Sequence, residues 1–148
     1  MTHEPLDHAA IAARVPHAGN MCLLHEVVTW NVESIECRAR SHRDPANPLR
    51  SRDRLAALHG IEYAAQAMAL HGALLGGDGA PASRPGYIGA VRAIELHVAR
   101  LDDIAGDLTV RADRLVGDTS HVLYSFTIRA GERVLVDGRI SAALGAAG

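Results

Sequence analysis

The sequence predicts an α+β domain in which an antiparallel β-sheet wraps around one long helix. Two extended segments precede a single alanine-rich helical segment, and four segments with alternating polarity follow it. The turns after the helix are short and contain glycine and aspartate, which suits antiparallel connections. At 148 residues the chain has the length of one domain, so we expect residues 1–148 to form a single unit.

The two extended segments before the helix, 22–30 and 34–42, are expected to form a hairpin. The first contains a Val-Val-Thr run that favours a strand, and Asn31 lies where the chain must turn. The stretch from 42 to 54 that follows contains two prolines. Because proline removes backbone donors and restricts the residue before it, this stretch is predicted to be a loop.

A helix is predicted over residues 55–75, ending at the Gly-Gly-Asp-Gly run of 76–79. At about 100° per residue, its apolar side chains fall on one stripe. The members of this stripe are Leu58, Ile61, Ala65, Met68, Gly72 and Leu75. His71 falls on the opposite face of the helical wheel.

Four strands are predicted after the helix, in segments around 94–98, 108–113, 122–128 and from 134 onward. In each segment, apolar residues alternate with polar ones. Their order along the chain predicts a four-strand meander. His25, His97 and His121 fall on predicted strands at outward positions.

Glu62 lies on the flank of the helical stripe rather than on the side predicted to face solvent. A carboxylate in apolar surroundings costs several kcal/mol unless it is paired or protonated. Two interpretations stay open from this segment alone. Glu62 is either a chemically active group, or a glutamate that is solvated at the edge of the stripe or paired with an arginine. Gln66, one helical turn later, is placed to hold the carboxylate in position.

Composition excludes several classes of protein. The net charge of −2 and an aromatic content of 3% argue against a nucleic-acid-binding protein. No apolar run is long enough for a transmembrane helix, and the N-terminus does not resemble a signal peptide. Cys22 and Cys37 have neither metal-ligand spacing nor the number for a disulfide framework, so we expect no metal site and a reducing, cytoplasmic setting.

Three stretches resemble the hotdog-fold 3-hydroxyacyl-thioester dehydratases. They are Val-Pro-His at 15–17 followed by Met-Cys-Leu-Leu at 21–24, Gly-Ile-Glu at 60–62 with Gln66, and Gly-Tyr-Ile-Gly at 86–89. Together with the loop from 44 to 54, they are most similar to the dehydratase-like proteins of bacterial aryl polyene pigment pathways. The resemblance covers nearly the whole chain and implies a hotdog fold.

The resemblance also implies a site. Dehydration needs a base for the C2 proton and an acid for the hydroxyl that leaves C3. In the family, the acid is an Asp or Glu on the helix, which corresponds to Glu62. The base is a loop histidine whose position falls near Asn47, where this chain has none. His17 is our first candidate for the base, ahead of His42 and His59.

Further roles follow from the resemblance. Backbone N–H groups of Ala57 and Leu58, near the predicted start of the helix, would bind the thioester oxygen. The substrate would be carried on the phosphopantetheine of an acyl carrier protein, with no other cofactor. Arg43, Arg50 and Arg52 in the loop before the helix are candidates for docking this acidic carrier.

The family pairs its domains, so we expect a homodimer or a higher oligomer. Two other functions stay open. The same scaffold supports acyl thioesterases, in which Glu62 would activate water. A chain without the loop histidine could instead be a non-catalytic, acyl-binding partner subunit that completes a heteromer with an active dehydratase.

Overall fold

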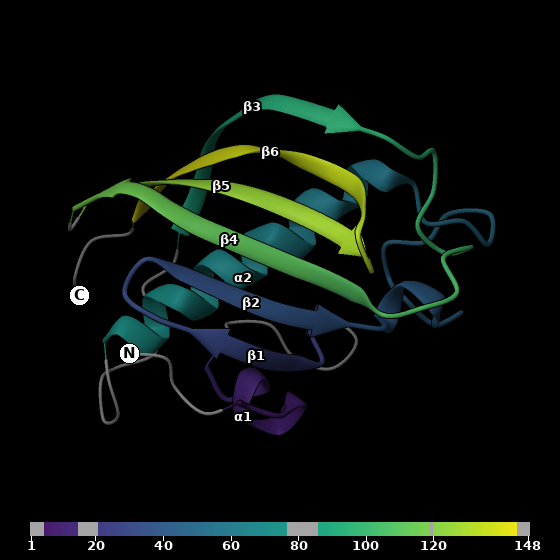
Figure 1. Ribbon diagram of the computed structural model, residues 1–148, viewed down its shortest axis with the longest axis horizontal. Coiled ribbons are helices and arrows are strands. Elements are labelled where there is room, and N and C mark those ends of the chain that lie inside the picture. The colour runs from purple at the N-terminus through teal and green to yellow at the C-terminus, as the bar shows by residue number, and fades with distance from the viewer. Residues whose placement is uncertain (1–4, 15–20, 77–85, 119, 145–148) are drawn as a thin grey trace.

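The computed structural model describes residues 5–14, 21–76, 86–118 and 120–144. One curved sheet lies across one long helix, and a short helix lies beyond the first strand (Figure 1). In chain order, the elements are α1 (His8–Ala12), β1 (Glu26–Trp30), β2 (Ser34–Ala39), the 3₁₀ turns η2 (Ser41–Arg43) and η3 (Ala57–His59), α2 (Gly60–Leu75), β3 (Gly86–Leu96), β4 (Leu108–Gly117), β5 (His121–Ala130) and β6 (Arg133–Leu144).

The six strands form one antiparallel sheet in the order β1-β2-β4-β5-β6-β3. The predicted β1–β2 hairpin is confirmed, and so is the run of hairpins through β4, β5 and β6. The predicted four-strand meander is wrong in one respect, because β3 pairs with β6 and not with β4. The segment between β3 and β4 is too long for a tight turn. It therefore carries the chain from one edge of the sheet toward the other, where β4 joins β2.

Helix α2 begins at Gly60, later than the predicted start at residue 55. The chain just before η3 does not join the helix, because Leu55 and Ala56 pair with the segment that follows β3. The N–H of Ala57 donates to the carbonyl oxygen of Ala99 at 3.0 Å, and the N–H of Leu101 donates to that of Leu55 at 2.8 Å. This long-range pairing competes with the helix and delays its start by several residues.

The buried face of α2 is not the predicted apolar stripe. Tyr63, Ala64, Ala67 and Leu70 are fully buried against the sheet, whereas Leu58 on the predicted stripe is 55% exposed. A helix that is apolar on almost every side does not reveal from its sequence which side meets the sheet. Met68 of the predicted stripe does lie in the core, and Ile61 packs against the core while partly buried, so the stripe borders the buried face of α2 rather than forming it.

His71, predicted on the face opposite that stripe, is consequently a core residue with no exposed surface. Its Nε2 lies 2.7 Å from the carbonyl oxygen of Asn31, and its Nδ1 lies 2.6 Å from the Tyr124 hydroxyl. Since a carbonyl only accepts, Nε2 carries the proton and Nδ1 accepts from Tyr124. None of the helices in the described part of the chain is long and apolar enough to cross a membrane.

Candidate functional site

Glu62 and Gln66 lie one turn apart on α2 and are joined by a hydrogen bond. The Gln66 side chain donates from Nε2 to Oε1 of Glu62 at 3.3 Å. The same amide donates to the carbonyl oxygen of Met21 at 2.6 Å and accepts from the N–H of Leu23 at 2.9 Å. Gln66 is buried, while Glu62 is half-buried. The amide therefore fixes the carboxylate of Glu62 and the segment before β1 in one arrangement.

His17, the predicted base, lies outside the described residues, so its position relative to Glu62 stays a prediction. His59 is half-buried at the start of α2 and makes no capping hydrogen bond with its side chain. His42, another candidate for the base, does not lie free on the surface of the loop. It is fully buried in η2.

The Nε2 of His42 lies 3.1 Å from the carbonyl oxygen of Ile104 and 2.9 Å from that of Gly106. Two carbonyl acceptors require a proton on Nε2. Burial lowers the pKa of His42 below the usual histidine range. The residue therefore ties the loop before the helix to the segment before β4, and its role is structural.

Asn47 occupies the loop position near which the family resemblance expects a histidine. It is 6% exposed and donates from Nδ2 to the carbonyl oxygen of Ser41 at 2.9 Å and to the Tyr63 hydroxyl at 3.1 Å. Its Oδ1 accepts from the N–H of Leu49 at 2.9 Å. Every polar atom of this side chain is engaged in bracing the loop against α2.

Tyr63 and Ser41 complete this polar network, which sequence reasoning missed. The Ser41 hydroxyl donates to the carbonyl oxygen of Leu23 at 2.8 Å and lies 2.8 Å from the Tyr63 hydroxyl. Burial raises the pKa of Tyr63, so it stays a neutral phenol. The sequence signal for this network was a tyrosine next to Glu62 on the helix. It could not be interpreted, because the direction of the Tyr63 side chain depends on which face of α2 is buried.

The two backbone N–H groups predicted to bind the thioester oxygen, those of Ala57 and Leu58, differ in their surroundings. The N–H of Ala57 is already engaged with Ala99, so in this structure it is not available to a thioester oxygen. This correction follows from the extended pairing before α2. Leu58 lies on the same 3₁₀ turn with an exposed side chain, and its backbone N–H stays a candidate.

The three arginines predicted to dock a carrier protein also differ in their surroundings. Arg43 forms an ion pair with Asp107 at 2.8 Å and donates to the carbonyl oxygen of Ala105 at 3.1 Å. Arg50 donates to the carbonyl oxygen of His42 at 3.0 Å and so braces the loop. Arg52 is exposed and has a φ of 54°.

A cavity of about 540 Å³ opens beside this loop, between α1 and the segment before β1. Its volume lies within the range of small-molecule pockets. Arg40 and Arg43 line it, together with Leu23, whose N–H is bonded to Gln66. Glu62 is not among its lining residues. The other lining residues are His8, Cys22, Leu24, His25, Ser41, Asp44 and Asn47.

The fold matches that of several solved structures. The dehydratase heterocomplex ApeI:P from Xenorhabdus doucetiae aligns with a TM-score of 0.82 and 22% identity, over 92% of this chain and 91% of that chain. A hypothetical thioesterase with coenzyme A from Streptococcus pneumoniae aligns with a TM-score of 0.57 and 12% identity, over 80% and 84%. A thioesterase from Haemophilus influenzae aligns with a TM-score of 0.58 and 15% identity, over 81% and 77%. The predicted hotdog fold is confirmed.

The comparison with protein families is more specific than the shared fold. No curated protein matches the chain. The model of one family, described as ApeP-like and as ApeP dehydratase, matches residues 9–145. This range includes Glu62, Gln66 and the loop that carries Asn47. The chain therefore belongs to the ApeP-like dehydratase family.

Proposed function

We propose that this dehydratase converts a 3-hydroxyacyl thioester, carried on an acyl carrier protein, into a trans-2-enoyl thioester in fatty-acid or aryl-polyene-type biosynthesis. A base takes the C2 proton, and the electrons of that C–H bond form the C2–C3 double bond. The C3–O bond breaks, and the carboxyl of Glu62 protonates the leaving hydroxyl, which departs as water. Neither step needs a redox cofactor or a metal.

The observation that supports this proposal most directly is the hydrogen bond from the Gln66 side chain to the carboxylate of Glu62. A general acid must be kept within hydrogen-bond reach of its substrate. The amide of Gln66, itself fixed by Met21 and Leu23, limits the positions that the carboxylate can adopt. A solvated glutamate with no chemical role would not need this support from a buried side chain.

We propose His17 as the base. Asn47 and His42 do not suit the role, because both are buried and their hydrogen bonds hold the loop before the helix. His17 precedes Met21 by four residues in the sequence, and the carbonyl of Met21 is bonded to the same amide that holds Glu62. Leu58 is the backbone donor proposed for the thioester oxygen.

We further propose that the protein works as a dimer in the cytoplasm. The edge strand β3 carries the exposed residues Val91 and Leu96, and the exposed Leu58 lies on η3, just before α2. A partner would cover these apolar surfaces and the open edge of the sheet. Two free, buried cysteines suit a reducing compartment. Arg52 and Arg43 are the proposed contacts for the acidic carrier protein.

A second candidate is a non-catalytic subunit that completes a heteromeric dehydratase. Two observations favour it: Asn47 stands near the position of the family's histidine, and the matched Xenorhabdus structure is a heterocomplex. A thioesterase is the third candidate, supported by the more distant structural neighbours.

Product analysis by mass spectrometry separates the three candidates. Purified protein incubated with a 3-hydroxyacyl carrier protein should yield an enoyl carrier that has lost one water. A free carrier thiol would identify a thioesterase. A partner subunit would show no turnover by itself but would increase the rate of an added active dehydratase. If His17 is the base, His17→Ala should abolish dehydration, whereas His59→Ala should retain most of it.

A further inference from the structure

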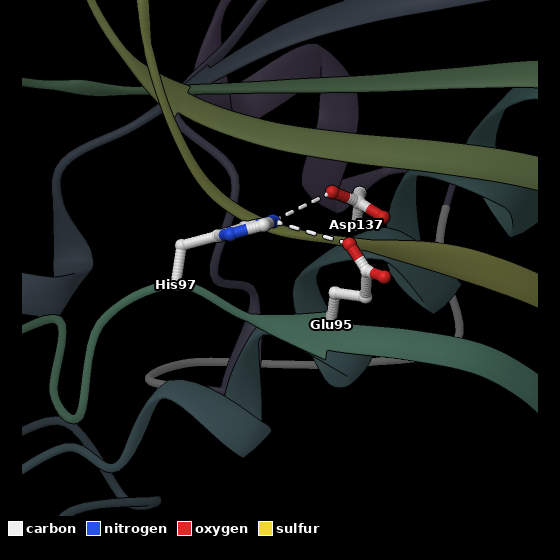
Figure 2. Close-up of side chains that lie close together, drawn as sticks. All are labelled: Glu95, His97 and Asp137. Atoms are coloured by element: carbon white, nitrogen blue, oxygen red, sulfur yellow. Dashed lines mark hydrogen bonds and ion pairs between the residues drawn. The ribbon is translucent and has the colours of Figure 1, made fainter.

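We propose that Glu95, His97 and Asp137 form a binding site for one divalent transition-metal ion, with Zn²⁺ as its probe. Figure 2 shows the two carboxylates converging on the same edge of the His97 ring. Their donor atoms all lie within 4.8 Å of one another. The site would link the edge strand β3 to β6, and no step of the proposed dehydration involves it.

The backbone places Glu95 and Asp137 directly opposite each other. They are register partners in the antiparallel pair of β3 and β6. The register shifts between Arg92 and Glu95, where Ala93 adopts a φ of 52°. Across from this bulge lies Gly138, where a Cβ would come within 3.2 Å of the Cα of Ile94. The bulge therefore depends on a glycine in β6, and it sets the register that brings the two carboxylates together.

His97 follows the last residue of β3, and its backbone is hydrogen-bonded to β6. Its N–H donates to the carbonyl oxygen of Leu135 at 2.8 Å. The Nε2 of its ring lies 2.9 Å from Oδ2 of Asp137 and 3.8 Å from Oε2 of Glu95. One nitrogen thus faces both carboxylates. Without a metal ion, Nε2 must carry a proton to donate to Asp137, and a metal ion would replace that proton.

The charges at this point favour a cation. Like charges directly opposite on neighbouring strands are destabilising. Glu36 and Asp113, acids on β2 and β4, each have an arginine within 4.0 Å. In the described part of the chain, Glu95 and Asp137 have no arginine within that distance, and the basic side chain that they share is His97. Arg92 and Arg139 of the same two strands are register partners of each other at the preceding position.

The donor set and its dimensions suit a small transition-metal ion. One imidazole and two carboxylates are ligands that Zn²⁺ accepts, with bonds of about 2.0–2.2 Å. Such bonds place neighbouring donors about 3–3.5 Å apart, so the 2.9 and 3.8 Å separations need only small adjustments. The side chains of Glu95 and His97 are 69% and 41% exposed, which leaves them free to adjust and leaves solvent for the remaining coordination positions.

The test is calorimetric titration of tag-free, EDTA-treated protein with Zn²⁺ at neutral pH. We expect one ion per chain with micromolar affinity, and at least about tenfold weaker binding in His97→Ala and in Asp137→Asn. His121→Ala is the matched control, because it removes another exposed histidine from a strand end, and it should bind like the wild type. Zn²⁺ should also raise the melting temperature of the wild type but not that of His97→Ala.

Two results of the titration would overturn the proposal. One is the absence of saturable binding at up to millimolar Zn²⁺, and the other is unchanged affinity in the site variants. Co²⁺ spectra separate this site from the cysteines, because a thiolate charge-transfer band would assign the ion to Cys22 or Cys37 and contradict the proposal. Glu95→Gln, at the most exposed of the three positions, keeps the test valid if another variant fails to fold.

Discussion

The polar side chains buried around α2 each have a specific set of partners. Gln66 makes three hydrogen bonds, and His71 is bonded through both ring nitrogens. Burying such groups without partners would cost about 1–3 kcal/mol each. From the sequence, Gln66 could be assigned to Glu62 because the helical spacing of four residues is local. His71 could not be assigned, because its partners Asn31 and Tyr124 are distant in sequence.

These buried histidines predict a pH dependence of stability. Burial lowers the pKa of both His42 and His71 in the folded protein. Between the folded pKa and the unfolded value near 6.5, the unfolded chain binds more protons, so stability rises with pH in this window. The free energy of unfolding in urea should therefore be smaller at pH 5 than at pH 7.5.

The His71→Gln variant should lose about 1–3 kcal/mol at pH 7.5 and show a smaller further loss at pH 5. His121→Gln, at an exposed position, should retain the wild-type pH profile. Backbone N–H donors lower the pKa of Asp118 to about 2. This carboxylate therefore changes the stability at a pH below the range compared in this experiment. Equal wild-type stability at pH 5 and pH 7.5 would contradict this account of the histidines.

At the scale of elements, strand β3 and the 3₁₀ turn η3 before α2 each expose apolar side chains. The β3 edge is unpaired within the described chain, and Leu96 on this strand is 48% exposed. The sequence identified most of the other elements because their alternation and turn residues are local signals. It did not reveal the pairing of β3 with β6, which depends on a crossover, nor the buried side of α2.

We predict that these surfaces form a dimer interface with the two β3 strands adjacent. Light scattering at micromolar concentration should give the mass of a dimer. Val91→Glu places a charge on the β3 edge and should shift the protein toward the monomer. Val32→Glu is the matched control, because Val32 is exposed in the turn between β1 and β2, and it should leave the dimer intact. A monomeric wild type would contradict the prediction.

At the scale of the whole molecule, the sequence predicted the fold class and singled out Glu62, whose role stays a prediction, but it did not predict the polar network near this residue. Glu62 was selected as a candidate because a carboxylate beside an apolar stripe is conspicuous, and the structure adds the hydrogen bond from the buried Gln66 amide. The polar network of Ser41, Asn47 and Tyr63 was missed because it joins a loop to a helix face. Such contacts follow from tertiary packing, which local patterns do not specify.

The central claim is that Glu62 is the general acid of a dehydratase, and the rate of Glu62→Gln tests it most directly. The substituted amide can still accept from Gln66, so the variant should fold with wild-type stability. Its dehydration of a 3-hydroxyacyl carrier protein, measured by mass spectrometry, should be slower by about two or more orders of magnitude. Glu33→Gln, in the exposed turn after β1, should match the wild type. Wild-type turnover by folded Glu62→Gln would contradict the claim.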